Sequence, residues 1–84
     1  MVTVKLFGTC RLDTRLKVIE LEASSVKELL PQIIGEVKKL DANNPVTEKD
    51  LKGCIISVNG KQAKLKTKLN NGDEVCLMPA VAGG

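Results

Sequence analysis

The residues with the clearest potential for chemistry stand at the end of the chain, which closes with Gly83-Gly84. Glycines carry no side chain, so a narrow channel in another protein can close around their backbone. A free carboxylate on Gly84 could be activated as an acyl-adenylate and then attacked by a sulfur nucleophile. Residues 79–84 hold one proline and otherwise only small or apolar residues, and we expect a flexible tail there. Many chain ends have no function, so incidental glycines remain an alternative.

Other reactive groups are sparse. The chain has no histidine, which excludes a Ser-His-Asp triad, and it has no phosphate-binding G-x-x-x-x-G-K loop. Its three cysteines, Cys10, Cys54 and Cys76, form no C-x-x-C pair, so we expect no metal site. Cys10 falls in a predicted loop beside Arg11, which could lower the pKa of its thiol and make it reactive. We therefore expect no active site that belongs to this chain alone.

The composition also limits the kinds of partner. The net charge is only +3 and the sole aromatic residue is Phe7, so a nucleic-acid partner is not expected. The sequence shows neither a signal peptide nor a membrane-spanning run, and we expect a cytoplasmic protein with no membrane partner. Lysines 61, 64, 66 and 68 form a basic stripe, either a solvated surface or a patch that steers an acidic partner.

The first half of the chain predicts two strands and one long helix. Val2, Val4 and Leu6 alternate with other residues, which is typical of a strand with one buried face, and residues 16–23 read as a second strand. Ser25 and Glu28 have capping-box spacing, and apolar residues follow at helical steps to residue 40. A proline at position 31 either bends this helix or marks its regular start, and the sequence leaves both open.

The second half predicts a hairpin and a final strand. Residues 8–14 and 41–50 read as loops, and residues 54–58 as a third strand. Asn59-Gly60 is a strong hairpin signal before a short strand at 61–63, and residues 70–73 form a turn before a strand at 74–78. We therefore predict a single α+β domain over residues 1–84, with a mixed sheet of four to five strands and one main helix.

Strand alternation also predicts a binding surface. If Val75 faces the core, Cys76 and Met78 face outward, and Phe7 and Ile55 fall on the same outward parity. Exposed apolar patches of this kind are typical of protein interfaces. The alternative is that Phe7 folds into the edge of the core.

The chain as a whole resembles a known family. The segment Asn71-Gly72-Asp73-Glu74-Val75, followed by Pro79, Val81 and Gly83-Gly84, is similar to the ending of the MoaD/ThiS sulfur carriers. The first strand, the helix from Ser25 and the Asn59-Gly60 turn fit the same family, and the resemblance is closest to MoaD, the small subunit of molybdopterin synthase. It implies the β-grasp, or ubiquitin-like, fold.

The resemblance also implies a mechanism. An E1-like adenylating enzyme would use ATP to activate Gly84, and sulfur would then replace one carboxylate oxygen to give a thiocarboxylate. The large subunit of molybdopterin synthase would accept the tail and pass the sulfur to a pterin precursor, so the chain itself would need no bound cofactor. The residues expected to contact partners are Phe7, Ile55, Cys76, Met78, Pro79, Val81 and Ala82, with Gly83 beside the reactive Gly84.

Three other functions remain open. MoaD tails commonly carry two consecutive prolines, whereas this chain has Pro79-Ala80, so a carrier for thiamine or tRNA thiolation is one alternative. A ubiquitin-like protein modifier uses the same adenylation but ends in an isopeptide bond. A β-grasp binding module without tail chemistry is the third.

Overall fold

The structure is a computed structural model that describes residues 1–80. Its five-stranded sheet has the order β2-β1-β5-β3-β4, with β1 and β5 parallel and the other neighbours antiparallel. The elements along the chain are β1 (Val2–Leu6), α1 (Gly8–Thr14), β2 (Val18–Leu21), α2 (Val26–Leu40), α3 (Glu48–Lys52), β3 (Ile55–Val58), β4 (Lys61–Gln62) and β5 (Glu74–Met78).

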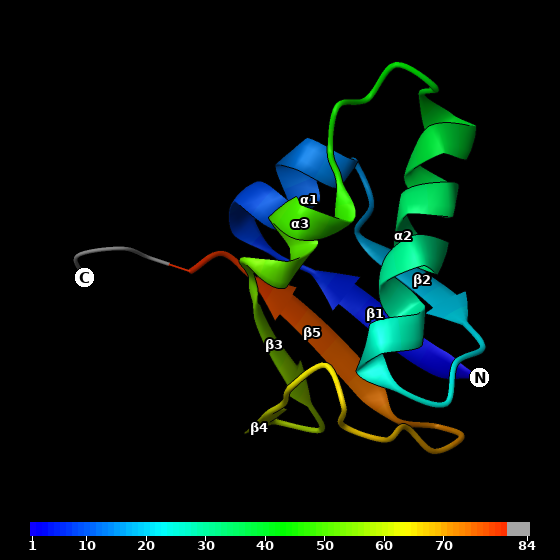
Figure 1. Cartoon of the computed structure of the whole chain (residues 1–84), viewed down its shortest axis with the longest axis vertical. Coiled ribbons are helices and arrows are strands. Elements are labelled where there is room, and N and C mark those ends of the chain that lie inside the picture. The colour runs from blue at the N-terminus through cyan, green and yellow to red at the C-terminus, as the bar shows by residue number, and fades with distance from the viewer. Residues whose placement is uncertain (81–84) are drawn as a thin grey trace.

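The three helices lie on one face of this sheet, and α2 is the longest of them (Figure 1). Val4 and Leu6 on β1 and Val75 and Leu77 on β5 point to that face and are at most 1% exposed. These four residues and the buried side of α2 form one apolar core. Apolar residues recur at every second position in the strands and at every third or fourth position in the helix, so each element presents one apolar face to this core. The predicted α+β architecture, a mixed sheet with one main helix, is confirmed.

Helix α2 begins at the predicted cap. The Glu28 backbone N–H donates to Ser25 Oγ at 3.4 Å, and the helix then continues to Leu40 with Pro31 inside it. The open question about Pro31 is thereby settled, since the helix starts before the proline. Pro31 has no N–H to donate to the carbonyl four residues earlier, so α2 lacks one backbone hydrogen bond.

Two segments that we predicted to be loops contain short helices. Residues 8–14 form α1, whose N-cap residue Phe7 makes no side-chain cap, so the sequence carries no local start signal. Residues 48–52 form α3, and here the signal was present: Thr47 and Asp50 form a reciprocal capping box. Burial of Leu51, which is 1% exposed, holds α3 against the core.

The predicted hairpin and final strand are confirmed. Asn59 and Gly60 have φ values of 52° and 85°, which the two central positions of a tight hairpin require. The return strand β4 ends at residue 62, one residue earlier than predicted, and β2 is shorter than the predicted 16–23. Strand β5 occupies the centre of the sheet between β1 and β3.

Candidate functional site

Strand β5 leads directly into the predicted reactive tail. Val75 and Leu77 are buried beneath the helices, whereas Cys76 and Met78 are half-buried on the opposite face, as strand alternation predicted. The chain then leaves the sheet at Pro79 and Ala80 (Figure 1). Val81, Ala82, Gly83 and Gly84 lie outside the described residues, so their expected roles stay predictions.

The point where the tail leaves the sheet, which we call the tail root (Met78, Pro79 and Ala80), rests against the turn after β1. The Phe7 backbone N–H donates to the Leu77 carbonyl at 3.0 Å. Gly8 follows with a φ of +55°, and a Cβ atom added there would lie 2.9 Å from Pro79 Cγ. Only glycine permits both this backbone conformation and this close approach, so the turn provides a fitted support for the tail root.

Sequence reasoning did not identify Gly8. Its contact with Pro79 joins positions near the two ends of the chain, and no local pattern announces it. The contact exists because β1 and β5 are parallel neighbours, which brings the residues that follow each strand to the same end of the sheet.

The predicted partner-binding residues of the sheet form a continuous group on its outer face. Ile55 pairs with Met78 across β3 and β5, and Phe7 directly follows Leu6, which pairs with Leu77. Phe7 is 44% exposed and Ile55 is 39% exposed. The alternative in which Phe7 folds into the core edge is therefore wrong. We call Phe7, Ile55, Cys76 and Met78 the outer patch.

Polar and charged side chains border the outer patch. Cys76 pairs with Lys5 on one side and with Ser57 on the other. Lys5 Nζ lies 3.1 Å from Glu74 Oε2, and both side chains are well exposed. A solvent-exposed ion pair of this kind contributes at most about 1 kcal/mol to stability, so its main consequence here is a polar rim beside an apolar centre.

The hypothesis of a reactive Cys10 thiol is contradicted. Cys10 lies in α1 rather than in a loop, and it is buried. Burial, together with the neighbouring thiol of Cys54 at 2.8 Å, raises the pKa of Cys10 to about 12, whereas the hypothesis required Arg11 to lower it. The Cys10 thiol therefore stays protonated at neutral pH and is a poor nucleophile.

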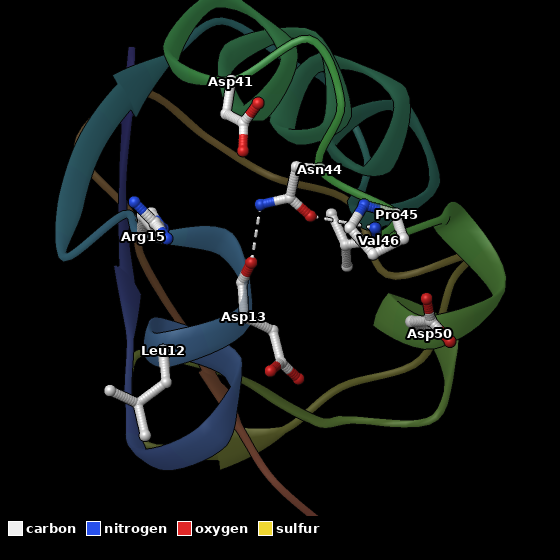
Figure 2. A pocket seen from close by; sticks show the side chains of 8 residues that line it. All are labelled: Leu12, Asp13, Arg15, Asp41, Asn44, Pro45, Val46 and Asp50. Carbon is white, nitrogen blue, oxygen red and sulfur yellow. Dashed lines mark hydrogen bonds between the residues drawn. The ribbon is translucent and has the colours of Figure 1, made fainter.

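Two hollows lie beside α1 and share Asp13, Val46 and Asp50 among their lining residues. In the one shown in Figure 2, Asn44 Nδ2 donates to the Asp13 carbonyl at 2.8 Å, and Asn44 Oδ1 accepts from the Val46 N–H at 2.9 Å. These bonds fasten the segment between α2 and α3 to α1, so Asn44 has a structural role. Leu12, Arg15, Asp41 and Pro45 complete that lining.

Comparison with known proteins identifies the family. The model of the ThiS family matches residues 4–84, which is nearly the whole chain. The chain belongs to the ThiS family. Its members are small ubiquitin-like sulfur carriers. No curated protein gave a significant match.

Solved structures agree with this family assignment. A chain in the complex of subunits 1 and 2 of the molybdopterin-converting factor from Helicobacter pylori is 30% identical, with a TM-score of 0.60, over 99% of this chain and 97% of that one. A chain in the Amycolatopsis orientalis BexX/CysO complex is 29% identical, with a TM-score of 0.65 and full coverage of both chains. SAMP1 from Haloferax volcanii, 21% identical over 99% of this chain and 98% of its own, has a TM-score of 0.73 and shows the shared β-grasp fold.

In this ThiS-family chain, the contact between Gly8 and Pro79 positions the tail root. Residues 1–80 contain no cluster of three or more potential ligands that could hold a metal ion. No helix within that part of the chain has the length and apolar content needed to cross a bilayer. The arrangement can hold the tail root at one end of the sheet and present the outer patch beside it.

Proposed function

We propose that this sulfur carrier serves molybdopterin synthesis as the small subunit of a molybdopterin synthase. The observation that carries the proposal is the likeness to a chain of the Helicobacter pylori molybdopterin-converting factor, which extends over 99% of this chain at 30% identity. That chain comes from a complex of subunits 1 and 2, which supports a protein partner for this chain as well.

In the proposed cycle, an E1-like enzyme consumes ATP to adenylate Gly84, and sulfur then replaces one carboxylate oxygen. The resulting thiocarboxylate enters the active site of a large subunit and transfers its sulfur to a pterin precursor. This chain needs no bound cofactor, because the adenylating enzyme uses the ATP and the large subunit supplies the catalytic groups. We place the reaction in the cytoplasm.

Two features of the structure support a partner-dependent role. The outer patch lies next to the tail root, so one partner could contact Phe7, Ile55, Cys76 and Met78 while it accepts the tail. Pro79 is held against Gly8, which fixes the position from which the tail leaves the sheet. Within residues 79–84, Val81, Ala82 and Gly83 would be enclosed by the partner.

The acceptor is tested by reconstitution. The thiocarboxylate form of the protein is mixed with a molybdopterin synthase large subunit and the pterin precursor, and the dithiolene product is measured. We expect product in proportion to the thiocarboxylate supplied and none from the unmodified protein. Absence of product, with a large subunit that works with its own small subunit, would contradict the pterin precursor as the acceptor. It would favour a role in thiamine synthesis or tRNA thiolation instead.

A protein modifier is the second candidate. The similarity to SAMP1, a small archaeal modifier protein, concerns the fold at 21% identity. A modifier would leave this chain attached to lysines of other proteins. Because the last lysine of the chain is Lys68, mass spectrometry of trypsin-digested cell extracts would then find peptides that carry residues 69–84 as a branch on lysine. A sulfur carrier leaves no such conjugates.

A further inference from the structure

Two thiols that are far apart in the sequence meet beside the tail root. Cys10 lies in α1, and Cys54 lies directly before β3. Their Sγ atoms are 2.8 Å apart, although 44 positions separate them in the chain. Both cysteines are free, and the sulfur-carrier cycle proposed above uses neither of them.

The distance between the two sulfurs exceeds the length of a covalent S–S bond by less than about 1 Å. An S–S bond is about 2.05 Å long, so the atoms need to approach by only about 0.8 Å. Neither residue lies within a strand of the sheet, and Cys54 occupies the short connection between α3 and β3. The approach therefore does not require any strand pairing to change.

The two thiols differ in their access to solvent. Cys10 is only 5% exposed, whereas Cys54 is half-buried. Both line an open hollow of about 530 Å³, and Pro79 and Ala80 line the same hollow. A small reagent can therefore reach Cys54 first, and Cys10 then lies directly behind it.

We propose that Cys10 and Cys54 form a thiol–disulfide redox site, which closes an intrachain disulfide when it meets a small-molecule disulfide. The Cys54 thiolate attacks one sulfur of the reagent, forms a mixed disulfide and releases one reagent thiolate. Cys10 then gives up its proton, and its sulfur attacks Cys54 Sγ and releases the second reagent thiolate. The protein loses two electrons and two protons, and the reagent disulfide becomes two thiols.

The high pKa of Cys10 agrees with this order of events. A protonated Cys10 does not compete for the reagent, and it becomes the resolving thiol only once Cys54 carries the mixed disulfide. In the oxidised form the new bond joins α1, which begins at Gly8, to the residue directly before β3, and β3 pairs with β5. The cross-link therefore connects the two elements on either side of the tail root.

The test uses the full chain with Cys76→Ser, so that only the pair can react. The protein is equilibrated in buffers of reduced and oxidised glutathione, quenched with acid and analysed by intact mass and peptide mapping. We expect a species that has lost two hydrogens and in which the Cys10 and Cys54 peptides are joined. Because the fold holds the sulfurs together, the equilibrium constant for this bond should be at least about tenfold larger in the folded protein than in urea.

Matched variants show whether both thiols are needed. In the same background, Cys10→Ala should stop at a mixed disulfide with glutathione on Cys54, and Cys54→Ala should leave Cys10 largely unmodified. The proposal is overturned if the Cys76→Ser protein keeps two free thiols, accumulates only glutathione adducts or forms only disulfide-linked dimers. An equilibrium constant that is equal in the folded and unfolded protein would also overturn it.

Discussion

Because Gly8 has no side chain, the Pro79 ring can pack directly against its backbone, and this contact positions the tail root. Gly8 combines a φ of +55° with a Pro79 ring that already occupies the space a Cβ atom would need, whereas Gly60 has a φ of +85° and open space around it. Substitution of Gly60 by alanine therefore measures the cost of backbone strain alone, whereas the same substitution at Gly8 adds a steric clash. Backbone strain alone costs about 1–2 kcal/mol for a residue with a Cβ atom.

We predict that Gly8→Ala lowers the free energy of unfolding by more than Gly60→Ala does. The excess, about 1 kcal/mol or more, reflects the clash with the Pro79 ring. Urea unfolding of both variants measures the difference. The clash should disappear in the double variant Gly8→Ala, Pro79→Ala, and equal costs for Gly8→Ala with and without Pro79 would contradict the contact.

Asp73 makes stability depend on pH. Its carboxylate accepts from the Asn70 backbone N–H at 2.8 Å and from Asn59 Nδ2 at 2.9 Å. These bonds favour the charged form and hold the pKa of Asp73 below its ordinary value of 3.8. The stabilisation is therefore present above that ordinary value and is lost as the pH falls through the lower pKa of the folded state.

The variant Asp73→Asn tests this dependence. At pH 7 it should be less stable than the wild type in urea unfolding. The asparagine side chain is uncharged and only its oxygen can accept a hydrogen bond, so it cannot replace the two bonds that the carboxylate accepts. As the pH is lowered below about 4, the difference between the two proteins should shrink. A difference that stays constant over this range would show that Asp73 does not act through its charge.

At the scale of elements, the outer patch is the surface that we expect a partner to cover. Met78 pairs with Ile55 on the adjacent strand, and its side chain points away from the core. Met78→Asp should weaken partner binding about tenfold or more, because a charge would be buried in an apolar contact, while the thermal transition changes little. Calorimetric titration with the large subunit measures the affinity.

Leu12→Asp provides the matched control for that substitution. Leu12 is 73% exposed on α1, which lies on the helical side of the sheet, so the same change of chemistry should leave partner affinity unaltered. Equal affinities for Met78→Asp and the wild type would remove the outer patch from the proposed interface.

Helix α2 carries a backbone defect that can be repaired. Pro31 is exposed and lies inside the helix, where it removes a hydrogen bond. Pro31→Ala should therefore raise the free energy of unfolding by about 1–3 kcal/mol. Gly35→Ala, a second exposed position with free space around it, should raise it by only about 0.5–1 kcal/mol. A smaller gain at Pro31 than at Gly35 would contradict this account.

The elements that the sequence predicts well are those with local signals. Alternation in β1, the Ser25 cap of α2 and the Asn59-Gly60 turn are each readable within a few residues, and the structure confirms all three. Helix α1 was missed because Phe7 provides no cap and because its stability comes from burial of Cys10 and Thr14. Helix α3 was missed although its capping box was visible, since the surrounding residues are polar.

At the scale of the whole molecule, the fold places the start of β1 and the exit of the tail at opposite ends of the sheet (Figure 1). The outward parity of β5 could be predicted from alternation, and so could the outer patch. The Gly8–Pro79 contact and the Cys10–Cys54 pair could not be predicted, because both depend on strands and helices that meet only after folding. The tail chemistry was predicted from Gly83-Gly84 together with the resemblance to the MoaD/ThiS sulfur carriers, and residues 81–84 lie outside the described part of the chain.

The most direct measurement of the central claim is the intact mass of the protein after incubation with ATP, a matching adenylating enzyme and a sulfur donor. We predict a mass gain equal to the replacement of one oxygen by sulfur, which is absent when Gly84 is deleted. An unchanged mass, with an adenylating enzyme that is active on its own carrier, would contradict the sulfur-carrier account and favour a β-grasp binding module.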